Sequence, residues 1–109
     1  MSLNDTQFVE ASRAFAQRIL LSSKKSDDER LNWAFAESTS RTPNAQEASV
    51  LLKAINRERA RYAAHRDLAQ AYVGVGESPV DPTLDIVELA AWSQFAAILL
   101  NLSETVTRN

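Results

Sequence analysis

Hydrophobic and polar residues follow the spacing of α-helices along most of this chain, with apolar positions recurring every three or four residues. Stretches with this spacing cover residues 6–21, 26–39, 44–64, 67–73 and 85–105. In the first stretch, one face is apolar and consists of Phe8, Ala11, Phe15 and Ile19. The opposite face is polar and consists of Glu10, Arg13 and Gln17. In the short stretch 67–73, the spacing predicts that Leu68, Ala71 and Tyr72 pack inward.

Signals for helix starts support the same division. In a capping box, the residue before a helix and a glutamate three positions later each satisfy a free backbone amide. Three segments have this form, namely Ser26-Asp27-Asp28-Glu29, Asn44-Ala45-Gln46-Glu47 and Asp85-Ile86-Val87-Glu88. Asn4 or Asp5 is expected to cap the first helix. Gly74 and Gly76 are expected to end the fourth. Capping and periodicity are independent signals, so their agreement favours a helical fold.

The last stretch is the most apolar of the chain. Its apolar arc consists of Trp92, Phe95, Ile98, Leu99 and Leu102, flanked by Leu89, Ala96 and Leu100. The remaining face is small or polar, with Ala90, Ser93, Gln94, Ala97 and Asn101. A helix this apolar is usually surrounded by others. We therefore predict an all-α fold in one domain over residues 1–109, a single irregular or orthogonal bundle of four to five helices with the C-terminal helix central.

Composition narrows the choice of function. The chain has no cysteine, which excludes disulfides, zinc–cysteine sites, covalent c-type haem and thiol catalysis. No apolar run approaches the roughly 20 residues that a membrane span needs, so no membrane insertion is expected. The net charge is −2, whereas proteins dedicated to nucleic acids are usually basic, so no nucleic-acid partner is expected. The densest basic cluster, Arg57, Arg59, Arg61 and Arg66, is interpreted as a solvated face with local ion pairs, and helical DNA binding through it is the third, less favoured hypothesis. Arg59 falls within the apolar stripe and is expected to form a structural ion pair.

No residue is predicted to be catalytic, cofactor-binding or metal-binding, and the chain is predicted not to be an enzyme. His65 is the only histidine, and its neighbours Arg61 and Arg66 disfavour a metal, so it is interpreted as a surface residue at a helix end. The acidic clusters are explained as helix caps. Gly74 and Gly76 lack the strand and the lysine of a phosphate-binding loop. No cofactor is therefore expected.

Trp33 leaves two interpretations open. It lies on the side of its helix opposite to Leu31, Ala34 and Phe35. In the first interpretation, Trp33 packs against another helix of the same fold. In the second, it sits at a surface that faces a partner or a missing part of a longer chain, since aromatic residues are enriched in such interfaces.

Several segments resemble, in order, a planctomycete domain family of unknown function that occurs in large secreted proteins beside cytochrome-c-like domains. Residues 3–11, LNDTQFVEA, resemble the family's "LNDPxFVEAA", and residues 16–20, AQRIL, are similar to its "AxRIL". Arg41-Thr42-Pro43 with Glu47 resembles "GRxPTxxE". LAAW at 89–92 and LLNLSE at 99–104 resemble the ending "ELAAWxxLAxxLLNLxEF". This chain has Ser40 where the family usually has glycine, and Thr105-Val106 where it has an aromatic residue.

The resemblance covers the C-terminal half of the family domain, which leads us to interpret the chain as a fragment of a larger multidomain protein. It implies a periplasmic or secreted protein and no known activity. We expect a non-catalytic accessory or interaction module that packs against other domains of its parent chain. The alternative is a redox-accessory domain that assists a haem-containing, cytochrome-c-like neighbour, an idea that rests on the resemblance and on His65. A homodimer through an exposed apolar patch is a further expectation, because a cut through a larger domain exposes apolar surface.

Overall fold

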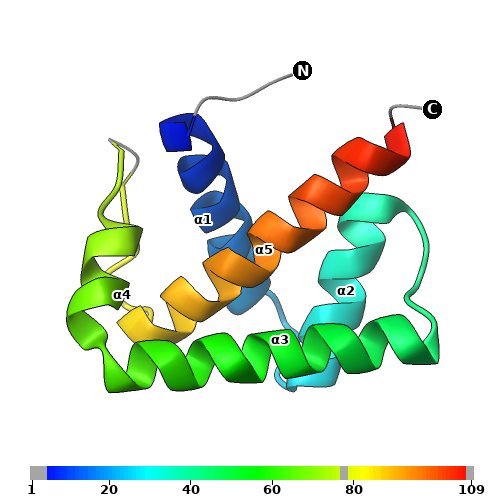
Figure 1. Ribbon diagram of the computed structural model, residues 1–109, viewed down its shortest axis with the longest axis horizontal. Helices are drawn as coiled ribbons and strands as arrows, with labels where there is room; N and C mark the ends of the chain where they lie inside the picture. The colour runs from blue at the N-terminus through cyan, green and yellow to red at the C-terminus, as the bar shows by residue number, and fades with distance from the viewer. Residues whose placement is uncertain (1–4, 77–78, 108–109) are drawn as a thin grey trace.

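The described residues form an all-α bundle, as the sequence predicts (Figure 1). The computed structural model describes residues 5–76 and 79–107. The helices are α1 (Asp5–Leu21), α2 (Asp27–Thr39), α3 (Ala45–Ala64), α4 (Arg66–Val73) and α5 (Ile86–Thr107). These boundaries differ from the expected ones by no more than two residues. Asn4, one of the two expected caps of the first helix, lies outside the described residues.

Helix α5 is central, which confirms the prediction made from its apolar sequence. It contacts each of the other four helices. In Figure 1 it crosses the bundle obliquely, from α3 and α4 at its first turns to the edge of the bundle at its last turns. The helices meet at steep angles, and α1 and α2 lie on different sides of α5.

The first half of α5 is largely buried, and this includes small residues of its less apolar face. Ala90 and Ser93, which the periodicity assigns to the less apolar face, are completely buried. Their small side chains let neighbouring helices approach closely, and the Ser93 hydroxyl donates to the Leu89 carbonyl at 2.6 Å. Trp92 packs edge-on against Phe95, with ring centroids 4.9 Å apart. On this central helix, small side chains therefore mark places where a neighbouring helix packs closely.

The polar face of α1 lies against another part of the chain. Arg13 is only 1% exposed, and its guanidinium donates to the carbonyls of Val73 and Val75, the latter at 2.7 Å. These carbonyls lie at the C-terminal end of α4, where a cation is electrostatically favoured. Gln17 accepts a hydrogen bond from the backbone N–H of Asp81 at 2.7 Å. The polar face thus binds the connection between α4 and α5.

The inward face of α4 differs from the prediction. Ala69 and Val73 are buried, while Leu68 is 46% exposed and Ala71 is exposed. Tyr72 is partly buried and stacks on Tyr62, with centroids 6.2 Å apart. A helix of eight residues has too few positions for its pattern to define one face, so contact with α5 decides which residues are buried. Leu102 is a similar case, since it belongs to the predicted arc of α5 but is 42% exposed.

The predicted capping boxes form at two helix starts and partly at the third. At the start of α2, the Ser26 hydroxyl accepts a hydrogen bond from the backbone amide of Glu29, and the Glu29 carboxylate accepts one from the amide of Ser26. At the start of α3, Asn44 and Glu47 form the same pair of hydrogen bonds. Asp85 accepts from the amide of Glu88 at 2.9 Å. The Glu88 carboxylate, however, binds Arg59 instead of returning to the cap.

The end of α2 has an unusual backbone conformation. Ser40 follows the helix with φ of 64° and ψ of 19°, in the left-handed region that usually holds glycine. Its backbone N–H donates to the carbonyl of Ala36 at 2.9 Å, which closes the last turn. This is the position at which the resembled family usually has glycine.

Candidate functional site

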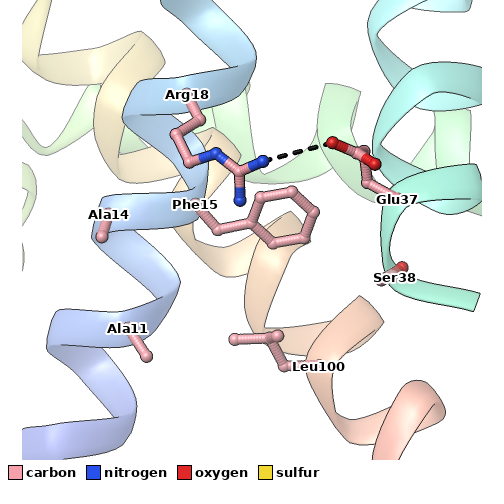
Figure 2. Close-up of a pocket in the computed structure, with 7 residues that line it drawn as sticks. All are labelled: Ala11, Ala14, Phe15, Arg18, Glu37, Ser38 and Leu100. Atoms are coloured by element: carbon pink, nitrogen blue, oxygen red, sulfur yellow. Dashed lines mark hydrogen bonds and ion pairs between the residues drawn. The ribbon is translucent and has the colours of Figure 1, made fainter.

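An open groove lies between α1 and α2, with α5 as its floor; we call it the α1–α2 groove (Figure 2). Its volume is about 510 Å³. The lining residues are Ala11, Ala14, Phe15 and Arg18 of α1, Glu37 and Ser38 of α2, and Leu100 of α5. Figure 2 shows Phe15 pointing from α1 across the groove, and Leu100 rising from α5 below it.

The wall formed by α1 presents small residues along one helix face. Ala11, Ala14, Phe15 and Arg18 have the spacing i, i+3, i+4 and i+7, so they lie over about two turns, or about 10 Å of helix. Ala14 is exposed and Ala11 is partly exposed. Small side chains of this kind allow another backbone to come close.

A charged pair crosses one end of the groove. The Arg18 guanidinium donates to the Glu37 carboxylate at 3.2 Å, and the side chains are 62% and 45% exposed. Arg18 also lies over the rings of Phe15 and Trp33, 5.7 Å from each centroid. Within the described part of the chain, Glu37 is its only hydrogen-bond acceptor. An exposed pair contributes only about 0.2–1 kcal/mol, so Arg18 is available to a second carboxylate at low cost.

Trp33 is partly buried and packs against the hydrophobic core. This agrees with the first interpretation of the residue, in which it packs within its own fold. Its contact with Arg18 also places it beside the charged end of the α1–α2 groove. The second interpretation, a surface facing a partner, stays a prediction.

A second apolar groove flanks the other side of α5; we call it the α3–α5 groove. Its volume is about 400 Å³. The lining residues are Phe35, Asn44, Gln46, Glu47, Val50, Leu51, Ile98 and Leu102. Val50 and Leu102 are 59% and 42% exposed, so two of the large exposed hydrophobic side chains share this groove.

Among the described residues that line the α3–α5 groove, Glu47 is the only charged one, and it is paired with Arg41. The Glu47 carboxylate accepts two hydrogen bonds from the Arg41 guanidinium, at 2.8 and 2.7 Å. These bonds, together with the backbone amide of Asn44, lower the pKa of Glu47 to about 2. The described lining of the groove therefore carries no uncompensated charge near neutral pH.

The basic cluster of α3 contains local ion pairs. Arg59 binds both oxygens of Asp27, at 3.0 Å each, and both oxygens of Glu88, at 2.6 and 3.0 Å. These contacts raise the pKa of Arg59, with the bonds to Asp27 as the main cause. Arg61 pairs with Glu58 at 2.9 Å, while Arg57 and Arg66 are exposed. The predicted ion pair of Arg59 is confirmed, and it joins α3 to the starts of α2 and α5.

His65 is exposed at the joint between α3 and α4, which agrees with its interpretation as a helix-end residue. It lies in neither groove. Among residues 5–76 and 79–107, no cluster of histidine and acidic side chains has the geometry to hold a metal ion. No helix within those ranges is both long and apolar enough to cross a bilayer.

Sequence reasoning missed both grooves, because a groove depends on how far apart two helices lie. The sequence held one signal of the α1–α2 groove, because Ala11 and Ala14 share a single helix face with Arg18.

Comparison with known proteins gives no further guidance, since no protein-family model, no curated protein and no solved structure matches this chain.

Proposed function

We propose that this chain is a non-catalytic accessory module of a larger exported protein, and that it binds the rest of its parent polypeptide through the α1–α2 groove. The observation that carries the proposal is the groove itself. It is an open groove, lined by small and apolar side chains and by one charged pair, that none of the described residues covers. The exported location rests on the resemblance alone.

The shape of the groove favours a helix as the occupant. Two helices form its walls and a third forms its floor, so a helix laid in it would complete a four-helix arrangement. Packed helices have axes about 8–10 Å apart, and the small side chains of Ala11, Ala14 and Ser38 suit that separation. Phe15 on the α1 wall and Leu100 on the floor would contact an apolar face of the incoming helix.

The charged end of the groove specifies a further property of the occupant. Arg18 has guanidinium N–H groups beyond the one that binds Glu37, and a guanidinium binds carboxylates well in bidentate geometry. A docked helix would therefore carry an aspartate or glutamate beside its apolar face, placed to reach Arg18.

The test is a binding measurement with a defined probe. The polypeptide encoded immediately upstream in the same reading frame is expressed separately and titrated into this chain, with calorimetry and tryptophan fluorescence as readouts. Trp33 touches Arg18, so occupation of the groove is expected to change its emission. Ala14→Phe fills the groove and is expected to lower the affinity at least about tenfold, or about 1.4 kcal/mol.

Ala60→Phe is the matched control, because Ala60 is an exposed alanine on α3, away from the groove. It should leave the affinity unchanged. Absence of binding at high micromolar concentration would overturn the proposal, as would equal effects of the two variants. A reading frame that encodes only these 109 residues would overturn it as well.

The haem-assisting alternative stays a prediction, and none of the contacts of His65 adds support to it. A haem titration with His65→Ala as control tests it directly. The idea requires a shift of the haem absorption band that the variant abolishes.

A further inference from the structure

We infer that α1 presents a packing seam to the occupant of the α1–α2 groove, in which Leu21 is an anchor one turn past the groove and Arg18 sets the register. The inference rests on the proposed function and deepens it. It specifies the partner as an amphipathic helix whose apolar residues alternate in steps of three and four, with one aspartate or glutamate opposite Arg18.

Four residues of α1 form this surface, which we call the α1 seam: Ala11, Ala14, Arg18 and Leu21. Their steps of three, four and three are those of the a and d positions along which two helices pack at a shallow angle. At about 100° per residue they share an arc of about 80°, over about 15 Å of helix. Figure 2 shows the first three along α1. Ala14, Arg18 and Leu21 are exposed and Ala11 is partly exposed, so the described bundle leaves this arc open.

Leu21 extends the docking surface beyond the groove. It is 59% exposed and does not line the groove, although it follows Arg18 by three positions on the same arc. Leucine at a d position is characteristic of two-stranded helix packing. A docked helix that ended at Arg18 would leave Leu21 in water, whereas one that follows the α1 seam would cover it. The exposure of Leu21 therefore favours an occupant of about three turns or more.

Arg18 is the one charged position of the α1 seam, and its guanidinium is oriented for a carboxylate. The centroids of the Phe15 and Trp33 rings lie 5.7 Å from its central carbon, and one N–H donates to Glu37 at 3.2 Å. A guanidinium has five N–H donors, and the others of Arg18 meet no acceptor among the described residues. These donors are available to a carboxylate of the occupant.

Arg59 shows within this chain how one guanidinium joins two further helices to its own. It binds Asp27, at the start of α2, and Glu88, in the first turn of α5, at 2.6–3.0 Å. By the same geometry, Arg18 would keep Glu37 of α2 and also bind a carboxylate of the docked helix. Other registers would place apolar side chains against the guanidinium. A single polar position in a seam therefore selects one register.

Binding of the upstream polypeptide to variants of the α1 seam tests the inference. Leu21→Ala should weaken the affinity at least about tenfold, because it truncates a buried anchor. Leu68→Ala is the matched control, since Leu68 is 46% exposed on α4 and lines neither groove. Arg18→Gln should also weaken the affinity about tenfold, whereas Arg57→Gln, at an exposed arginine of α3, should leave it unchanged.

A double-mutant cycle locates the carboxylate that meets Arg18. Each aspartate and glutamate of the upstream polypeptide is changed to its amide and titrated into the unmodified chain and into Arg18→Gln. One amide should weaken binding to the unmodified chain about fivefold or more, and binding to Arg18→Gln less than about twofold. Arg18→Lys should bind almost as weakly as Arg18→Gln, because an ammonium group lacks the fork that holds two carboxylates. Far-UV circular dichroism checks that every variant stays helical.

The possible results distinguish a failure of the α1 seam from a failure of the groove. Absence of binding overturns both proposals. Binding that Ala14→Phe weakens, but that Leu21→Ala or Arg18→Gln leaves unchanged, overturns the α1 seam and leaves the groove as the site. A cycle in which no acidic residue couples to Arg18 also overturns the seam. Self-association of the chain alone that Leu21→Ala abolishes would assign the seam to a second copy and would overturn the inference too.

Discussion

The two halves of α5 have similar apolar sequences and different surroundings. From Val87 to Phe95 most side chains are buried, including Ala90 and Ser93 on the less apolar side. From Ile98 to Leu102 the helix has a groove on either side, and Leu102 is 42% exposed. Figure 1 shows the reason, because the first turns lie against α3 and α4 while the last turns reach the edge of the bundle.

The comparison teaches that apolar character alone does not distinguish a core from a docking surface. Leu99 is completely buried and Leu100 lines a groove, although they are neighbours on one helix. The two side chains point in different directions from the same turn, so their contacts with neighbouring helices make the difference. We therefore expect the first half of α5 to carry stability and the second half to carry recognition.

The largest effect is expected from truncation in the first half. Phe95 is 1% exposed, so Phe95→Ala should lower the free energy of unfolding by about 3–5 kcal/mol through lost burial and a cavity. Leu102→Ala, in the second half, should change it by less than about 0.5 kcal/mol. Urea denaturation followed by circular dichroism measures both. Similar losses for the two variants would remove the distinction between the halves.

The ion pairs of Arg59 are expected to have the next largest effect, because they hold the first turn of α5. Arg59→Met leaves the carboxylates of Asp27 and Glu88 without their common cation. It should lower the free energy of unfolding by about 1–3 kcal/mol, a moderate loss because the Arg59 side chain is partly exposed. Arg57→Met, two residues away on the exposed face of α3, should stay within about 0.5 kcal/mol. Equal unfolding midpoints for the two variants would show that Arg59 does not anchor α5.

A smaller effect is expected at the start of α5. The Asp85 carboxylate accepts a hydrogen bond from the backbone amide of Glu88 and so caps the helix. Asp85→Ala removes this cap and should lower the free energy of unfolding by about 1 kcal/mol. Asp28→Ala is the control, because Asp28 lies in the first turn of α2 without serving as its cap. Thermal unfolding compares the two, and a larger loss at Asp28 would contradict the role of Asp85.

The smallest effect is expected beside the second half of α5, at Glu47. Hydrogen bonds from Arg41 hold the pKa of Glu47 at about 2, below its ordinary value of 4.5. A lowered pKa adds stability that is present above pH 4.5 and is lost as the pH falls toward 2. Unfolding of the natural chain and of Glu47→Gln should therefore differ at neutral pH and converge in acid. A difference that does not change with pH would rule out this linkage.

Local signals in the sequence predicted much of the fold. Ser26 and Asn44 mark helix starts because a capping box is formed by residues close in the chain. The centrality of α5 followed from its wide apolar arc. The ion pair of Arg59 followed from a charge within an apolar stripe, although its partners Asp27 and Glu88, 32 and 29 positions away, did not.

The missed features depend on contacts between distant segments. The burial of Arg13 was not predicted, because the sequence does not show that the end of α4 folds over α1. The short α4 gave no single face, so Leu68 and Ala71, which were predicted to pack inward, are exposed. The grooves were missed for a similar reason, since they are defined by the separation of helices that the sequence does not state.

The left-handed serine at the end of α2 has a consequence for how this chain tolerates change. At a φ of 64°, a residue with a side chain is destabilised by steric repulsion of about 1–2 kcal/mol, which glycine does not suffer. Glycine, in turn, loses more backbone entropy on folding, which offsets part of that difference. Ser40→Gly should therefore raise stability by up to about 1 kcal/mol without touching either groove. Such a gain would compensate for a mildly destabilising change elsewhere. Position 40 could then act as a permissive site, at which one substitution allows the groove residues to diversify toward new partners.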